Sequence, residues 1–551
     1  MEAIEVVLNE LRRQDIRLWD EGERLHYSSA RGTLAPEVLA TLRQRKGEIL
    51  DFLRRMRATE AQAATAIASS DRQDDLPLSF AQERLWFLDR LGITGNAYHL
   101  PVNLRLRGHL DRDALGRALS EILRRHETLR TTFTAKGARP IQIVRPVGEI
   151  ELEVEIAPGA TRADRDQALS ELALAAMREP FDLENGPMIR IRLVALAPDE
   201  HVLICVIHHI AFDGWSMGVF IRELRQLYEA YAADRPMSLP ALPIRYADYA
   251  VWQRQQLQGE RLERLRNYWR SQLSDLPRIE LPIRGQRPAV QTFRAGVCLR
   301  DIPVELSDKL TQLSHAHRTT PFVVLLSVFS ILLKQYSGLD RIAVGTPVAN
   351  RNRAEIEGLI GFFVNYLVLC SDLSGDPSIA HLIERVRDMS VEAFEHQDMP
   401  FEQLAQDLQP ERDLSAPPLV QISFALQERH AMAPRFRMGD LEAGLLEVGD
   451  ATVRFDLELH IWPEEQGFRI AAIHNADLFD TATVERMLDQ YLRLLERAAA
   501  SPTVRLSGLD VLGSDEAREQ LVEWNRTGVA VELGDVAGAI SAQAGRTPAA
   551  A

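Results

Sequence analysis

One short segment constrains the fold of this chain more than any other. Residues 201–209 read HVLICVIHH, and every residue from Val202 to Ile207 is apolar. The preceding run 187–196, PMIRIRLVAL, alternates apolar and polar residues, and the APDE between the two runs is typical of a turn. The two runs predict a β-hairpin. Because its second strand has no polar face, we expect that strand in the middle of a sheet covered on both sides.

The rest of the chain predicts an α+β protein with more than one domain. Its 551 residues are too many for a single compact core. The pattern of residues 76–510 predicts two α+β halves of similar size that meet near residue 265. Helical periodicity predicts helices over residues 110–130, 220–231, 321–338 and 483–500. Strand patterns cover residues 149–156, 341–350, 419–427, 453–462 and 467–475.

Smaller units flank the two halves. Residues 1–57 show a helix–hairpin–helix pattern with a marginal core, which suits an accessory or interaction module. The next residues are rich in alanine, serine and acidic side chains, which is typical of a linker. After residue 512 the pattern weakens and a new unit begins. The predicted units are therefore 1–57, the linker 58–75, 76–265, 266–512 and 513–551.

Charge and cysteine content restrict the partners of the protein. A net charge of −15 at pH 7 argues against nucleic-acid binding, which needs a basic surface. Cys205, Cys298 and Cys370 are widely spaced, so they predict buried thiols in a reducing cytoplasm instead of disulfides or a zinc site. The N-terminus lacks the apolar core of a signal peptide, and no run of about 18 uncharged apolar residues appears, so we expect no membrane span.

Residues 208–216, HHIAFDGWS, are the main candidates for chemistry. Their histidines could be metal ligands, packed core side chains, or a group that exchanges protons with a substrate. Adjacent strand residues point to opposite faces, so His208 and His209 cannot easily bind one ion, and no HExxH pattern or third ligand lies nearby. One histidine can be anchored in the core while its neighbour faces a cavity and accepts a proton from an amine or hydroxyl.

The residues after the histidines suit a rigid frame. A buried Asp213 needs a cation or hydrogen-bond donors, so we expect it to brace the loop. Gly214 allows a tight turn and a close approach of backbone, and Ser216 is well placed to cap the helix that follows. No GxSxG elbow and no catalytic Cys–His pattern is evident. Direct transfer between two bound substrates therefore fits better than a covalent acyl-enzyme.

The segment HHIAFDGWS resembles the core motif of condensation domains from nonribosomal peptide synthetases. Six further stretches resemble the other motifs of that family in the expected order: LSFAQERLWFL (78–88), RHETLRTTF (125–133), YADYAVWQR (246–254), IGFFVNYLVL (360–369), HQDMPFEQL (396–404) and RDLSAPPLVQISF (412–424). The intact set favours peptide-bond formation over cyclization or epimerization. Residues 1–57 resemble the small docking domains that join synthetase subunits, and the tail is similar to the truncated start of an adenylation domain.

The resemblance implies a fold and a reaction. The fold would be two chloramphenicol-acetyltransferase-like lobes in a V-shaped pseudo-dimer, with a tunnel between them open at both faces. An upstream peptidyl carrier protein would present an acyl or peptidyl thioester on its phosphopantetheine arm, and a downstream carrier would present the amine. Further partners would be the adjacent adenylation domain and an upstream synthetase subunit bound through residues 1–57. The domain itself would bind no cofactor and no metal.

The resemblance also implies roles for individual residues. His209 would either take the proton of the amine or position the amine, and the Gly214 N–H could donate to the developing oxyanion. His208 and Asp213 would be structural. Arg125 is the first choice as partner of Asp213, and Arg351 is the second. The candidates for the substrate tunnel, each with packing or capping as its alternative, are Trp215, Ser216 and Asn365.

Two alternatives to the main interpretation stay open. The protein could be a starter domain that takes a fatty acyl group from acyl-CoA, as the first step of a lipopeptide. It could also be a non-catalytic platform that recruits partner enzymes. Such platforms usually lose the HHxxxDG residues, so the intact HHIAFDG argues against the second alternative.

Overall fold

In the computed structural model of the protein, the described residues are 16–21, 24–29, 67–69, 75–137, 139–237, 239–409, 413–427, 435–446, 451–509, 512–528 and 535–549. The predicted N-terminal hairpin is confirmed, because β1 (Ile16–Glu21) pairs antiparallel with β2 (Arg24–Ser29). The two helices predicted on either side of this hairpin lie outside the described residues.

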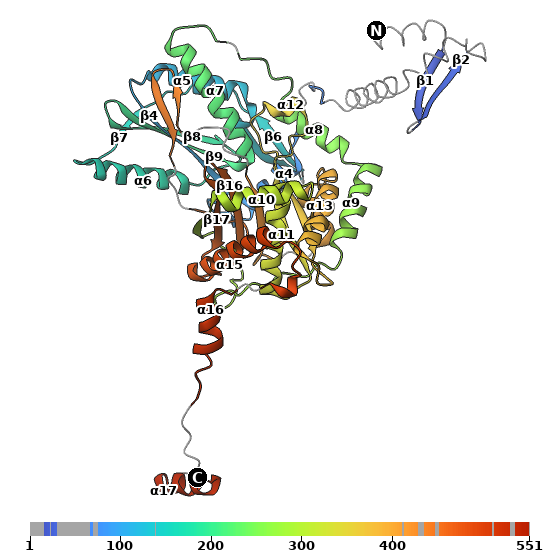
Figure 1. The fold of residues 1–551 in the computed structure, drawn as a ribbon. Coiled ribbons are helices and arrows are strands. Elements are labelled where there is room, and N and C mark those ends of the chain that lie inside the picture. Colours follow the sequence, from blue (N-terminus) through green and yellow to red (C-terminus); the bar gives the residue numbers. More distant parts are fainter. Residues whose placement is uncertain are drawn as a thin grey trace.

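The N-terminal half of the main body, which we call the N-lobe, is built on a mixed sheet. In the described residues its strand order is β14-β15-β4-β9-β8-β7 (Figure 1). The bounds are β4 (His99–Arg107), β7 (Val154–Ile156), β8 (Ile189–Ala197), β9 (Glu200–His208), β14 (Arg435–Met438) and β15 (Leu441–Leu445). The apolar strand β9 lies between β4 and β8, as its sequence predicts.

Both faces of β9 are covered. Leu203, Cys205 and Ile207 belong to a cluster with side chains of α5 (Arg112–Arg125) and α7 (Gly214–Ala232). The intervening residues of the strand pack on the opposite face against α6 (Arg162–Arg178). The end of β9 is therefore held by two packed layers, and the residues that follow start from a fixed point.

The C-terminal half, the C-lobe, contains a second sheet with strand order β10-β17-β16-β13-β11-β12 among the described residues. Its strands are β10 (Ala295–Ile302), β11 (Arg341–Val348), β12 (Asn365–Asp372), β13 (Ile422–Leu426), β16 (Leu457–Glu464) and β17 (Gly467–Asn475). The helices of this lobe are α10 (Val304–Ala316), α11 (Pro321–Ser337), α13 (Ile379–Glu395) and α15 (Thr481–Ala500). The α+β class with two lobes is thus confirmed.

Helix α11 lies in the centre of the C-lobe core, with every residue from Val323 to Leu333 buried. It ends at Gly338, whose φ of +70° is left-handed and suits glycine. Among the described helices, none is by itself long and apolar enough to cross a membrane. The pair α10 and α11 passes that test only jointly, and it is bent by 104°.

The two lobes are not consecutive in the chain, which corrects the predicted boundary at residue 265. That residue lies inside α9 (Gly259–Leu273), whose Leu265, Trp269 and Leu273 pack in the C-lobe core. In the other direction, β15 pairs with β4, so the hairpin β14–β15 belongs to the N-lobe sheet. Figure 1 shows these orange strands beside the blue strand β4. Local periodicity carries no information about such long-range pairing.

Several predicted elements are shorter than expected, among them one strand and one helix of the N-lobe. The strand predicted over 149–156 is formed only at β7, and before it the backbone N–H of Ile150 donates to the hydroxyl of Ser120 on α5. The helix predicted over 110–130 begins after its cap Asp111, ends at Arg125, and is followed by the 3₁₀ turn η1 (Glu127–Arg130).

The remaining elements complete the described chain. They are β3 (Leu76–Pro77), α4 (Phe80–Arg90), β5 (Thr131–Lys136), β6 (Arg139–Val144), η2 (His209–Ala211), α8 (Tyr246–Gln256), α12 (Ala354–Glu357), α14 (Phe401–Leu408), η3 (Leu506–Gly508), α16 (Ser514–Arg518), the π-helical turn η4 (Glu519–Glu523) and α17 (Val536–Arg546). Strands β3, β6 and β5 form a small sheet of their own.

Candidate active site

The two adjacent histidines stand where β9 ends. The N–H of His208 donates to Met188 O at 3.0 Å, and the N–H of His209 donates to Tyr98 O at 2.8 Å. His208 is the last strand residue, and His209 opens the turn η2. Neighbouring strands on both sides therefore fix the backbone of the pair.

The two imidazoles have different surroundings. His208 is buried against the rings of His99 and Phe181, at centroid distances of 5.9 and 5.5 Å, and its Nδ1 accepts from the N–H of Ile210 at 3.1 Å. Burial first, and then the neighbouring imidazoles and a guanidinium, lower the pKa of His208 well below its usual value. His208 is thus a buried, neutral core side chain, and its purely structural role stays a prediction.

His209 lies instead between Tyr98 and Phe362, with ring centroids 6.3 and 4.8 Å away. Its Nδ1 lies 2.7 Å from Phe212 O, and because a carbonyl oxygen only accepts, Nδ1 must carry the hydrogen. The lone pair is therefore on Nε2. Burial and the neighbouring Arg454 lower the pKa of His209 to about 4, so the imidazole is neutral at pH 7.

The geometry gives no support to metal binding by this pair. Within the described ranges, no group of three His, Cys, Asp or Glu side chains is placed to hold a metal ion. Nδ1 of His209 is used by a carbonyl, and Nδ1 of His208 accepts from a backbone amide. The two interpretations that remain for His209 are packing and participation in acid–base or hydrogen-bond chemistry.

Asp213 is fully buried and forms the brace that the sequence predicts, but its partner is Arg351. Arg351 Nη2 lies 3.0 Å from Oδ1 and 3.2 Å from Oδ2 of Asp213. Ser216 donates to the same carboxylate twice, from its backbone N–H at 2.8 Å and from its hydroxyl at 2.7 Å. The backbone N–H of Phe363 donates to it at 3.1 Å. The N-cap of α7 is therefore Asp213, and the prediction that Ser216 caps this helix is wrong.

Arg125, the first choice as partner of Asp213, pairs with Glu223 at 3.1 Å. The reason is the helix geometry: Glu223 stands ten residues into α7, about 15 Å along its axis from Asp213. His126 Nε2 binds the same carboxylate at 2.9 Å, and its Nδ1 accepts from the N–H of Ile360 at 3.2 Å. The stretch RHETLRTTF thus supports the site through the middle of α7.

Both braces reach a loop of the C-lobe, residues 349–364, which joins β11 to β12. Arg351 donates to Ile356 O at 2.7 Å and to Leu359 O at 2.8 Å, and its guanidinium lies over the ring of Phe363 at 4.1 Å. The hydroxyl oxygen of Ser216 accepts from the N–H of Gly361 at 3.1 Å. The buried ion pair therefore joins the lobes beside His209.

The three tunnel candidates have different environments. Trp215 is 40% exposed and donates its indole N–H to Glu357 O at 2.9 Å, so the alternative of core packing is wrong for it. Ser216 is fully buried in the Asp213 network. Asn365 donates to Gln397 O and Met399 O and accepts from the N–H of Phe401, which favours the packing alternative. A tunnel role stays a prediction for all three.

Gly214 is exposed at the first position of α7, and a Cβ placed on it would meet no atom of the described residues within 4 Å. The close approach of backbone that the sequence suggests does not occur within this chain. The space beside Gly214 is open to another molecule.

Two residues at this site were missed by sequence reasoning. They are Arg454 and Glu458. Arg454 Nη1 lies 3.3 Å from His209 Nε2, and Arg454 Nη2 lies 3.7 Å from the carboxylate of Glu458. The signal was present in VRFDLELHIW, where charges at positions 454, 456 and 458 alternate within an otherwise apolar strand pattern. A buried strand with charges on one face indicates that this face meets polar groups.

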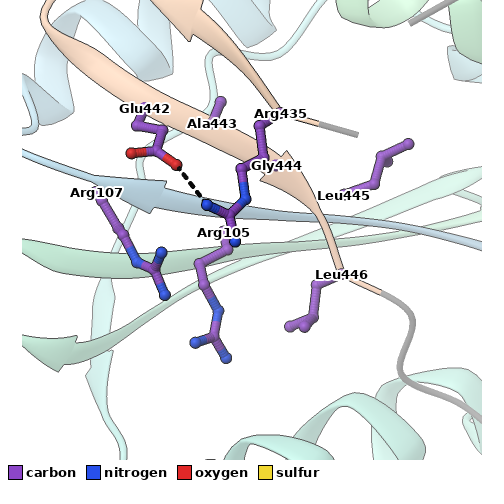
Figure 2. Close-up of a pocket in the computed structure, with 8 residues that line it drawn as sticks. All are labelled: Arg105, Arg107, Arg435, Glu442, Ala443, Gly444, Leu445 and Leu446. Carbon is purple, nitrogen blue, oxygen red and sulfur yellow. Dashed lines mark ion pairs between the residues drawn. The ribbon is translucent and has the colours of Figure 1, made fainter. Parts of the chain in front are cut away.

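A separate cavity of about 230 Å³ lies at the edge of the N-lobe sheet. Figure 2 shows Arg105 and Arg107 of β4 beneath Arg435 and Glu442 of the hairpin β14–β15, with the last two forming an ion pair at 3.5 Å. None of the residues lining this cavity belongs to the predicted site. The catalytic candidates therefore lie apart from it.

We expect the Asp213→Ala substitution to destabilise the protein by about 3–5 kcal/mol, because it leaves the buried Arg351 without its counter-charge. The matched control is Asp489→Ala, which breaks the partly exposed pair with Arg300 and should cost less than about 1 kcal/mol. Urea unfolding followed by fluorescence measures both. Equal losses in the two variants would contradict the brace.

The neutral state of His209 predicts a pH-dependent stability. Its pKa is lowered to about 4 in the folded protein and is about 6.5 unfolded, so the unfolded chain binds more protons between these values. This histidine should therefore cost about 3 kcal/mol of stability as the pH falls from about 7 to 4. We expect His209→Asn to lose less stability over that interval than the unsubstituted protein, measured by urea unfolding at each pH. Parallel curves would show that His209 is not held neutral.

Comparison with known proteins shows which families the chain resembles. Residues 72–522 match the family model of the condensation domain, and residues 4–55 match that of the TubC N-terminal docking domain. The chain is 41% identical over 466 residues to a linear gramicidin synthase of Brevibacillus parabrevis, covering 83% of this chain and 6% of that protein. It is 36% identical over 476 residues to the isonitrile lipopeptide synthase of Mycobacterium tuberculosis, covering 84% of this chain and 19% of that protein.

Among solved structures, the X-domain from teicoplanin biosynthesis in complex with OxyB has a TM-score of 0.75 and 29% identity, covering 82% of this chain and 99% of that chain. This similarity and the two sheets confirm the expected chloramphenicol-acetyltransferase-like fold. The chain spans only a small part of the synthetases that it matches. It belongs to the condensation-domain family of nonribosomal peptide synthetases, whose members are amide-forming acyltransferases.

Proposed function

We propose that this protein transfers an acyl or peptidyl group from a carrier-bound thioester to the amine of an aminoacyl group on a second carrier. The observation that carries the proposal is the neutral imidazole of His209, fixed through Nδ1 and presenting a lone pair on Nε2 where the two lobes meet. The substrates would be held on phosphopantetheine arms of carrier proteins. The cytoplasmic location expected from the sequence belongs to the same proposal.

The reaction needs few groups from the protein. The amine nitrogen attacks the thioester carbonyl carbon, a C–N bond forms, the C–S bond breaks, and the nitrogen proton ends on the released thiol. A neutral Nε2 can accept a hydrogen bond from the amine and align it with the carbonyl. Because a group with a pKa near 4 is a weak base, we propose that His209 mainly positions the amine.

The first turn of α7 supplies a second feature. Amides in the first turn of a helix have no partner inside the helix, so the Gly214 N–H is free of intrahelical bonds. We propose that it donates to the oxyanion of the tetrahedral intermediate. The open space at Gly214 supports this role, because a substrate can reach the backbone there.

Both ends of the chain suggest partners. Residues 4–55 match a docking domain, which supports an upstream synthetase subunit as partner. At the other end Leu521, Trp524, Val536 and Ile540 are 62–76% exposed, which is unusual for large apolar side chains and suits an adenylation domain that would cover them. The carrier proteins would deliver donor and acceptor.

The donor has a second candidate. The similarity to a lipopeptide synthase keeps a fatty acyl-CoA donor open for this chain. The two donors are distinguished by loading the downstream carrier with its amino acid, offering acyl-CoA or acyl-carrier in parallel, and reading the product by mass spectrometry. Amide from acyl-CoA alone would assign a starter domain, and amide from neither would leave the non-catalytic alternative.

We expect His209→Ala to slow amide formation by about 10²-fold, because the amine loses the acceptor that aligns it with the thioester carbonyl. Single-turnover reactions with loaded carriers measure the rate. The control is His381→Ala, which removes an exposed imidazole on α13 and should leave the rate unchanged. An unaltered rate in the His209 variant would remove the basis of the proposed function.

Gly214→Ala separates a role in substrate binding from a role in folding. We expect unchanged or slightly higher stability, because alanine favours helix over glycine by about 1 kcal/mol and its Cβ meets no atom. Amide formation should nevertheless slow by about tenfold or more, since the methyl group occupies the approach to the backbone N–H. Gly218→Ala on the same helix, also into open space, is the matched control and should remain active. Full activity of both variants would exclude substrate contact at Gly214.

A further inference from the structure

The lone pair of the His209 imidazole is already occupied. Because Nδ1 of His209 carries the ring hydrogen, Nε2 can only accept, and the donor is Arg454 Nη1 at 3.3 Å. His209 is 7% exposed in this arrangement. An amine that uses Nε2 as its acceptor must therefore take the place of the guanidinium.

Arg454 is fixed at its backbone and held more loosely at its guanidinium. Glu458, itself 2% exposed, accepts from the N–H of Arg454 at 2.6 Å and from the N–H of Phe455 at 3.3 Å. The guanidinium lies 3.7 Å from the same carboxylate, and His460 binds the other side of Oε2 at 3.0 Å. The guanidinium can thus change its hydrogen-bond partners while the backbone N–H of Arg454 stays bound to Glu458.

The charges around His209 come from several elements. Asp213, before α7, is paired with Arg351. The rings of Tyr98 before β4 and Phe362 in the loop before β12 flank the imidazole, and His208 is neutral. Two charges act on the imidazole, and Arg454 lowers the pKa of His209 more than Asp213 raises it. Arg454 itself faces Glu458 on β16 and two phenols, those of Tyr98 and of Tyr366 on β12.

Glu458 remains ionised beside this cation. Burial alone would raise the pKa of its carboxyl group, but Arg454 and His460 outweigh burial and hold the pKa at about 2. The carboxylate of Glu458 is therefore ionised near neutral pH, and the ion pair is present there. It keeps a positive charge next to Nε2.

We propose that Arg454 is a positioning residue that covers Nε2 of His209 in the substrate-free protein and yields this contact to the acceptor amine in its free-base form. An ammonium group would meet the like charge of the guanidinium, whereas the N–H of a neutral amine replaces the guanidinium N–H as donor. The replacement of Arg454 by the acceptor amine rests on the proposed function. The contact of Arg454 with Nε2 in the substrate-free protein does not.

The cover is tested by NMR titration of the histidine side chains in the substrate-free protein, with His209→Asn identifying the resonance. We expect Arg454→Gln to raise the pKa of His209 by about one or more, toward the ordinary value near 6.5, whereas Arg454→Lys keeps the charge and the low pKa. The double variant Arg454→Gln/Glu458→Gln removes both members of the pair, so that no unpaired buried carboxylate affects the result. An unchanged pKa in both the single and the double variant would overturn the inference.

The role in amine selection is tested by kinetics. Dividing kcat/KM of Arg454→Gln by that of the unsubstituted protein at each pH cancels the ionisation of the amine. We expect this ratio to fall by about twofold or more between about pH 8 and pH 5, because an imidazole whose pKa rises from about 4 by about one becomes half protonated near pH 5, and to stay flat for Arg454→Lys. A flat ratio in the Gln variant would contradict the role. Activity of His209→Asn would contradict the proposed function instead, and leaves the titration result standing.

Discussion

The buried pair of Asp213 and Arg351 is the interaction on which the candidate site depends. Both side chains are almost completely excluded from solvent, so each charge requires the other. The carboxylate also starts α7 and holds the backbone N–H of Phe363, while the guanidinium holds the carbonyls of the loop before β12. This ion pair thus ties the end of β9 to the C-lobe.

The position of His209 follows from this frame. Strand β9 delivers it from the N-lobe, while Phe362 and Arg454, which contact its ring, come from the C-lobe half of the chain. An imidazole between two lobes experiences the burial and charge of both. A single strand and its turn could not produce the same neutral, partly covered side chain.

Much of this could be predicted from local pattern. The hairpin β8–β9, the buried helix α11 and the bracing role of Asp213 follow from apolar periodicity and from the cost of a buried charge. The partner of Asp213 could not be chosen, because Arg125 and Arg351 are both far from it in sequence and only the fold places one of them within reach. Arg454 was missed for the same reason: its neighbour lies 245 residues away.

The exchange of the hairpin β14–β15 has a consequence for modular engineering. If the chain were cut at the sequence midpoint, β4 would lose its neighbour β15 and expose an unpaired row of backbone amides and carbonyls. A recombination point between the lobes therefore cannot be a single junction. Swapping one lobe with that of a related synthetase requires that residues 435–446 travel with the N-terminal segment, although they are encoded in the other half of the chain.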